Sequence, residues 1–350
     1  MVTQNELRVF YETDLKPKLL FFEEQRLLLS RKRKILWIIY GILVILAILA
    51  LIMVFNLETG YLQTIYREFV GKSRYYSADD TVIIVLVIFG IIIYVITFYM
   101  AIAHSYTKMK SIYRNRFKTT VVGSLVTFID KNLSYTPKDD STVKELLFKK
   151  EFHNSDLFIR GKDVNRWSGE DYVGGILGGT SLNVSEIHAK MQYTRKKKPS
   201  VYYSDIFKGL FFVFNINWNF EGATTFIVPE DHYGSLDNFL EKYFPLAKKE
   251  SKFRVYSDNP TIATYVFSTA FMDRLLALHN RLKVPIKLSF VNSKLYIAIS
   301  IEEDLFEPPI YSTVLDFQLI QTIFAYMQLG QEIVEELIVL MKQLNPMDLE

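Results

Sequence analysis

Two long, uninterrupted apolar runs dominate the hydropathy pattern of this chain. Ile35 to Phe55 is a run of 21 residues without a charge, and Val82 to Ala103 adds 22 more. At about 1.5 Å per residue, each run forms a helix of roughly 32 Å, close to the hydrocarbon thickness of a bilayer. Neither run has the polar stripe of a core helix in a soluble protein. The pattern therefore predicts transmembrane helices at 35–55 and 82–103, joined by an outer loop at 56–80.

The positive charges beside the runs predict an orientation in the membrane. Arg31, Lys32, Arg33 and Lys34 abut the first run, and five cations ending at Lys118 follow the second, whereas the loop carries three. Lys and Arg are retained on the cytoplasmic side. We therefore expect a multi-pass protein of the plasma membrane with both termini in the cytoplasm.

Charge separates this membrane module from the rest of the chain. Residues 1–118 hold 16 Lys and Arg against 9 Asp and Glu, a net +7, whereas residues 119–350 hold 25 against 29, a net −4. The absence of Cys excludes disulfides, thiolate metal ligands and Cys nucleophiles. We expect a mildly acidic globular domain joined to the membrane module, and its negative charge argues against nucleic-acid binding.

Outside the two long runs, the spacing of apolar residues predicts the other segments of the chain. Residues 1–34 form an amphipathic arm that either docks on the domain or lies on the membrane, 104–135 form a cytoplasmic helical extension, and 143–345 form the domain. Hairpins alternating with helices indicate an α+β fold with a mainly antiparallel sheet. The expected elements are a strand at 182–193, hairpins at 206–217 with 223–228 and at 286–290 with 295–299, and helices from Asp258 to Leu282 and from Thr313 to Leu344.

Six short motifs follow the second run in a fixed order. They are LSYTP (133–137), SDLF (155–158), GEDYVG (169–174), SEIHA (185–189), IFKGLFF (206–212) and VYSD (255–258). With the two runs, they resemble a widespread bacterial family of two-span membrane proteins of unknown function, over nearly the whole chain. The resemblance implies a bacterial plasma-membrane protein without assigned catalytic residues, often encoded near LemA-type membrane proteins, which makes a LemA-type protein a candidate partner. The chain departs from the family at GGILGG (174–179), where a more polar turn is expected.

Candidate chemistry within the domain is sparse. Gly174, Gly175, Gly178 and Gly179 could bind an anion through backbone N–H groups, but they lack a P-loop lysine and precede a strand, which favours a simple turn. Glu186 and His188 lie two residues apart on a strand, hence on one face, and are the candidate catalytic pair. The five His residues have no second ligand at helix spacing, so we expect no metal site, and no motif indicates a cofactor.

One basic run stands out in the domain, formed by Arg195, Lys196, Lys197 and Lys198. Each cation near an anionic membrane surface contributes about 1 kcal/mol. This run and the Arg31–Lys34 cluster are therefore candidate membrane-surface contacts. A solvated, flexible loop is the alternative interpretation of residues 195–198.

These observations predict an integral membrane protein that presents a cytoplasmic α+β domain as a binding or scaffold module for membrane partners. The absence of catalytic signatures argues against an enzyme. Two alternatives stay open. One is a membrane-tethered enzyme that uses Glu186 and His188, and the other is a subunit of a channel or transporter. The latter requires a homo-oligomer to enclose a pathway, because neither run carries a charge at mid-depth.

Overall fold

The structure, a computed structural model, describes most of the chain. The described residues are 2–59, 78–137, 142–158, 164–177, 179–195, 198–216, 225–229, 246–250, 253–259, 263, 269–291 and 293–343. They form two compact units. The sheet unit contains Met1–Lys18, Phe117–Pro308 and Asp316–Glu350, and the helical unit contains Leu19–Arg116 and Pro309–Leu315.

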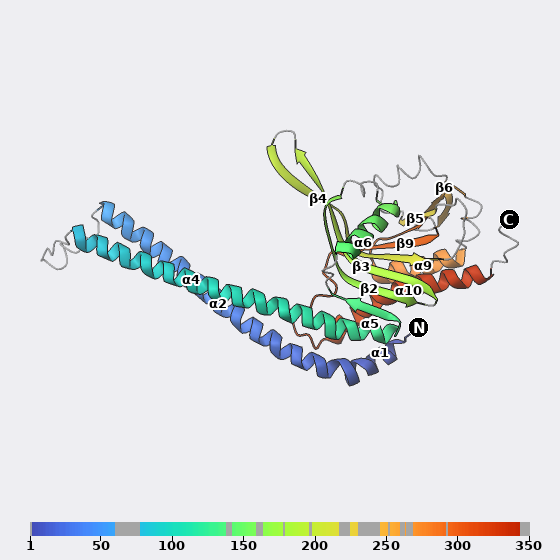
Figure 1. Cartoon of the computed structure of the whole chain (residues 1–350), viewed down its shortest axis with the longest axis horizontal. Coiled ribbons are helices and arrows are strands. Elements are labelled where there is room, and N and C mark those ends of the chain that lie inside the picture. Colours follow the sequence, from blue (N-terminus) through green and yellow to red (C-terminus); the bar gives the residue numbers. More distant parts are fainter. Residues whose placement is uncertain are drawn as a thin grey trace. The chain divides into compact units, whose positions relative to one another are not determined.

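The helical unit is built from two long helices, α2 (Lys16–Thr59) and α4 (Ala78–Phe117) (Figure 1). They pack antiparallel, because the Phe22 ring lies 6.2 Å from the Tyr113 ring and Lys32 donates a 3.0 Å hydrogen bond to Ser105 farther along. The loop Pro309–Leu315 packs against both helices. Its Pro309 carbonyl accepts from the Tyr113 hydroxyl at 3.2 Å.

Apolar side chains cover the outer surface of these helices in the region of the expected spans. Trp37 and Ile38 on α2 are 67% and 63% exposed, and Tyr94 and Met100 on α4 are 70% and 62% exposed. Within the residues that the structure describes, one helix, Phe89–Ile129, is long and apolar enough to cross a membrane. One of the two expected spans is thus represented, and the transmembrane pair is not confirmed.

The sheet unit contains a mixed fold with an antiparallel sheet, which confirms the expected α+β class. Neighbouring strands follow the order β1-β2-β3-β4-β9-β8-β5-β7-β6 among the described residues, and every described pairing is antiparallel. The strands are β1 (Leu133–Thr136), β2 (Val164–Leu177), β3 (Thr180–Arg195), β4 (Lys198–Asn215), β5 (Thr225–Pro229), β6 (Leu246–Glu250), β7 (Phe253–Ser257), β8 (Ile286–Val291) and β9 (Lys294–Ser300).

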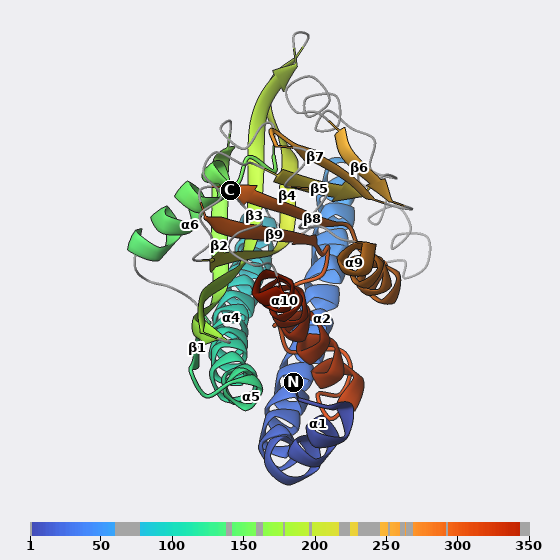
Figure 2. The ribbon, with the colours of Figure 1, turned by 90° about the vertical axis from the view of Figure 1, so that its right-hand side faces the viewer.

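Helices cover both faces of this sheet (Figures 1 and 2). On one face, Phe148 and Phe152 of α6 pack with Phe211 and Tyr296 in a single buried cluster. Residues of opposite parity, such as Phe212, are buried on the other face, on the side of α9 and α10. The described helices of the unit are α1 (Gln4–Phe10), the π-helical turn η1 (Tyr11–Leu15), the π-helical turn η2 (Lys118–Val122), α5 (Gly123–Ile129), α6 (Thr142–Asn154), α9 (Thr269–Leu282) and α10 (Phe317–Gln343).

Residues 2–18 of the N-terminal arm pack within the sheet unit, whereas residues 19–34 belong to the helical unit. Leu7 and Leu15 are fully buried, and the Phe10 ring stacks on Phe128 of α5 at 4.0 Å. Tyr11 meets Phe317 of α10 edge-on at 5.0 Å.

The hairpin expected from strands at 206–217 and 223–228 is wrong. Strand β4 pairs with β3 and β9, whereas β5 pairs with β7 and β8. Strand β4 is buried on both faces over residues 209–214, so it is a central strand that needs a partner on each edge. The longer strand β9 supplies that second edge. The expected β8–β9 hairpin is confirmed, with Val291 opposite Lys294.

The last helix starts later than the sequence predicts. Asp316, not Thr313, supplies the cap, because its Oδ1 accepts from the Gln318 amide at 2.9 Å. In the helical unit, the Val314 amide donates to Glu23 at 3.1 Å, and residues 313–316 are not helical. Helix α9 is described from Thr269, and residues 260–262 of its expected first turn lie outside the described residues.

Candidate functional site

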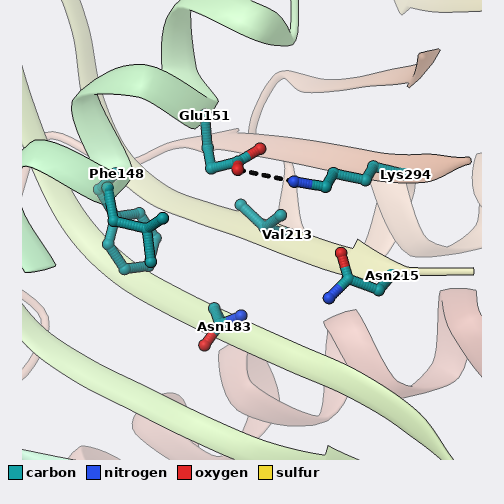
Figure 3. Close-up of a pocket in the computed structure, with 7 residues that line it drawn as sticks. Phe148, Glu151, Asn183, Val213, Asn215 and Lys294 are labelled. Carbon is teal, nitrogen blue, oxygen red and sulfur yellow. Dashed lines mark hydrogen bonds and ion pairs between the residues drawn. The ribbon is translucent and has the colours of Figure 1, made fainter. Parts of the chain in front are cut away.

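A pocket of about 140 Å³ lies between α6 and the sheet (Figure 3). The strand residues that line it belong to one face, because Asn183 pairs with Val213 and Asn215 pairs with Lys294. Helix α6 closes the opposite side. The lining residues are Leu147, Phe148 and Glu151 of α6, Asn183 of β3, Val213 and Asn215 of β4, and Lys294 of β9.

Polar groups of the pocket are held in place by neighbouring side chains. One oxygen of Glu151 pairs with the Lys294 ammonium at 2.7 Å, and the other accepts from the Tyr296 hydroxyl at 2.8 Å. The Tyr172 hydroxyl donates to Asn183 Oδ1 at 2.5 Å, which orients that amide. The arrangement combines a balanced ion pair, two amides and an apolar wall, as small-molecule sites commonly do.

One of the sequence-predicted glycines makes this geometry possible. Tyr172 lies over Gly174, where a Cβ atom would come within 2.3 Å of the tyrosine hydroxyl oxygen. Any side chain at residue 174 would therefore displace Tyr172 and release Asn183. The glycine serves close packing beside the pocket, a role that the sequence reasoning missed.

A second cluster of interest is a buried group of charges around Lys118, on the opposite face of the sheet from α6. The Lys118 ammonium, only 5% exposed, pairs with Asp171 at 2.7 Å, with Glu307 at 2.9 Å and with Glu170 at 3.2 Å. The Tyr135 hydroxyl also donates to Asp171. In the sequence, Lys118 counts among the cations that flank the second run. The structure instead buries it in the π-helical turn that follows α4.

Glu186 enters this cluster from β3. Burial raises the pKa of its carboxyl to about 8, and the nearby Asp171 and Glu170 carboxylates act in the same direction. Burial also raises the pKa of Asp171 to about 7, although Lys118 and Tyr135 oppose the shift. Because Asp171 has a short ion pair with Lys118, we assign the proton retained at neutral pH to Glu186. Within the described residues, no three His, Asp or Glu side chains are grouped to hold a metal ion.

These shifts predict an unusual pH dependence of stability. The pKa of Glu186 in the folded chain lies above the value near 4.5 of an exposed glutamate, so the folded state binds the proton more tightly than the unfolded state. The free energy of unfolding should therefore fall as the pH rises from 5 to 8. Between pH 5 and pH 8, the loss in the free energy of unfolding should be smaller for Glu186→Gln than for the wild type by more than about 1 kcal/mol. Urea unfolding at the two pH values measures this loss.

The matched control for this experiment is Glu145→Gln, at an exposed position of α6. It should leave the pH dependence of the wild type unchanged. Equal slopes for the wild type and Glu186→Gln would show that Glu186 does not carry the buried proton.

The structure gives Glu186 and His188 different surroundings. Glu186 faces the Lys118 cluster, whereas His188 Nε2 lies 2.5 Å from Asp205 Oδ1. Asp205 also pairs with Lys190 at 3.2 Å, near the surface. Glu186 and His188 thus have different polar partners in the structure.

The other candidate residues from the sequence lie in helices, strands and turns of the structure or outside the described residues. Gly174 and Gly175 are inside β2, paired with β1 and β3, and Gly179 takes a φ of +86° before β3. Lys32 contacts Ser105, and Arg33 stacks over Tyr311 at 4.1 Å. Gly178, Lys196 and Lys197 lie outside the described residues, as do the side chains of Arg195 and Lys198.

Sequence comparison finds a family of unknown function in the C-terminal part of the chain. Residues 205–338 match the profile of a family described as "Protein of unknown function (DUF3137)". This match confirms the expected domain of unknown function, and it contains Val213, Asn215 and Lys294 of the pocket. The two-span organisation and the LemA-type link are not part of this finding. No curated protein matches the chain.

Structural comparison finds a distant similarity to a mycobacterial protein. The solved structure is described as the crystal structure of the mycobacterial trehalose monomycolate transport factor A, TtfA. The similarity covers 61% of this chain and 91% of that chain, with 11% identity and a TM-score of 0.32.

Proposed function

We propose that this protein is anchored in a bacterial plasma membrane by α2 and α4 and that its sheet unit is a cytoplasmic binding module. The observation that carries this proposal is the apolar surface of the two helices, where Trp37, Ile38, Tyr94 and Met100 are all more than 60% exposed. Contiguous apolar surface of this extent is costly in water, and a bilayer would cover it.

The charges beside the helices give the proposed anchor its orientation. Arg31 and Lys34 are exposed where α2 leaves the apolar stretch, and cations such as Lys108 and Lys110 follow the apolar stretch of α4. Lys and Arg at these ends favour a cytoplasmic location for both termini and for the sheet unit. Residues 56–80 would then form the outer loop.

A binding role is favoured over catalysis by the content of the sheet unit. The pocket beside α6 has oriented polar groups and an apolar wall, whereas Glu186 and His188 have separate partners. A LemA-type membrane protein or a second copy of the chain is a candidate partner of this module. Among the described residues, no feature favours the channel alternative.

The β3–β4 hairpin is a second surface that suits a membrane partner. Beyond Met191 of β3, no other described strand pairs with the hairpin, which extends past the rest of the sheet (Figure 1). The Tyr193 and Tyr202 rings stack near its end, and Tyr203 is 46% exposed. Tyrosines next to the cations of residues 195–198 form a combination suited to the headgroup region of an anionic bilayer.

Cysteine accessibility tests the anchor and its orientation. The chain has no Cys, so Ser73→Cys in the loop and Ser200→Cys in β4 each introduce a single thiol. We expect a membrane-impermeant maleimide to label Ser73→Cys in intact cells and to label Ser200→Cys only after the cells are permeabilised. The protein should also stay in the membrane pellet after a carbonate wash. Release by carbonate, or the reverse labelling pattern, would refute the proposal.

A further inference from the structure

We infer that the pocket between α6 and the sheet binds a compact apolar carboxylate, meaning a carboxylate joined to a branched or aromatic group of about four to six carbon atoms. The inference rests on the proposed binding role of the sheet unit and names its ligand class. Two sources carry this chemistry. One is a small free carboxylic acid, and the other is the C-terminal residue of a partner polypeptide.

The polar side of the pocket is arranged to donate hydrogen bonds. The Tyr172 hydroxyl already donates a hydrogen bond to Asn183 Oδ1. The amide nitrogen of Asn183 is therefore the group that can donate a hydrogen bond to a ligand. In Figure 3, the nitrogen ends of the Asn183 and Asn215 amides face each other below Val213. The Lys294 ammonium also lines the pocket, above Val213 and beside Glu151 in Figure 3, and has two further protons beyond the one that it gives to Glu151.

The carboxylate of Glu151 does not change the preference of the pocket for a ligand that accepts hydrogen bonds. Its two oxygens already accept from Lys294 and Tyr296, so its charge is balanced within the protein. A ligand that accepts hydrogen bonds therefore gains two amide donors and an ammonium. A cationic ligand would meet the same ammonium and two amide nitrogens, which disfavours it. Charge-assisted bonds to a carboxylate are stronger than bonds to a neutral acceptor.

The apolar side of the pocket sets the size of the rest of the ligand. Leu147, Phe148 and Val213 form a wall beside the polar groups, and Leu147 is 44% exposed at the edge of the pocket. The cavity of about 140 Å³ resembles in size an engineered 150 Å³ cavity that binds benzene. A leucine-like or phenyl group fits this space, whereas a long acyl chain exceeds it.

Isothermal titration of the detergent-solubilised full chain with 4-methylpentanoate tests the inference. We expect saturable binding of this acid and at least tenfold weaker binding of 3-methylbutylamine, which has the same apolar group and the opposite charge. A peptide that ends in Leu with a free carboxylate distinguishes the two sources. Tighter binding of this peptide than of the acid, lost when its C-terminus is amidated, identifies a polypeptide partner, and otherwise the ligand is a free acid.

Variants of the pocket provide the matched controls. Leu147→Trp should fill the pocket and abolish binding, whereas Leu146→Trp, at the neighbouring exposed leucine outside the lining, should bind as the wild type does. Asn215→Asp, at an exposed position, should weaken binding at least tenfold through like-charge repulsion. Circular dichroism confirms that each variant is folded.

Two results would overturn the inference. They are the absence of saturable binding by both the acid and the peptide, and undiminished binding by Leu147→Trp and Asn215→Asp. Because the titration uses purified protein, it is independent of the labelling experiment that tests the membrane anchor. A failure of either proposal can therefore be told apart from a failure of the other.

Discussion

Lys118→Met should destabilise the sheet unit by about 3–5 kcal/mol, because removing one partner of a buried ion pair leaves an uncompensated charge. The lysine is the cation that Asp171, Glu307 and Glu170 share, and the side chain of Asp171 is only 1% exposed. Lys118 begins the π-helical turn directly after α4, so its loss should loosen the attachment of this turn to β2. Urea unfolding at pH 8, followed by Trp fluorescence, measures the effect.

Two comparisons make this experiment specific. Lys131→Met changes an exposed lysine two residues after α5 and should cost less than about 0.5 kcal/mol. The double variant Lys118→Met with Asp171→Asn should recover part of the lost stability, because the buried carboxylate is then neutral. A Lys118→Met protein as stable as Lys131→Met would contradict a structural role for the cluster.

Gly209→Ala should be similarly damaging, with an expected loss of more than about 3 kcal/mol or a failure to accumulate folded protein. Gly209 adopts a φ of +145° in β4, which side chains rarely allow. A Cβ atom there would lie 2.0 Å from the Ile299 carbonyl oxygen and 2.8 Å from the Ile301 amide nitrogen. These are backbone atoms of the adjacent chain segment, so no side-chain rotation relieves the clash.

Gly169→Ala is the matched control for this substitution. Residue 169 also lies in a strand, but its added Cβ would meet side-chain atoms no closer than 3.5 Å. We expect a change within about 1 kcal/mol, measured by the same urea titration. Equal stability of the two variants would show that β4 and β9 can separate at residue 209 without cost.

Much of the secondary structure could be predicted from the sequence, whereas the pairing of the strands could not. The β8–β9 hairpin was predictable because its two strands are joined by a short turn. The pairing of β4 with β9 could not be predicted, because β9 lies about 80 residues farther along the chain. The alternation of apolar and polar residues identifies a strand but not its partners. The packing of the whole sheet selects those partners from distant strands.

The candidate sites were harder to predict than the elements. Glu186 was identified from its spacing to His188, but its actual neighbours are Lys118 and Asp171. Lys118 resembled a membrane-flanking cation in the sequence, since nothing local distinguishes a buried lysine from an exposed one. The pocket was missed because Glu151, Asn183, Asn215 and Lys294 come from four separate segments, and each residue alone resembles an ordinary polar surface position.

The sequence by itself determined the two apolar runs, the α+β class and the local hairpin of β8 and β9, because these follow from periodicity and turns within short stretches of chain. Only the tertiary structure decided the docking of Leu7 and Leu15, the later start of α10, the burial of Lys118 and the existence of the pocket. The physical reason is that each of these depends on contacts between distant segments, and the free energy of such contacts is absent from any single stretch of sequence.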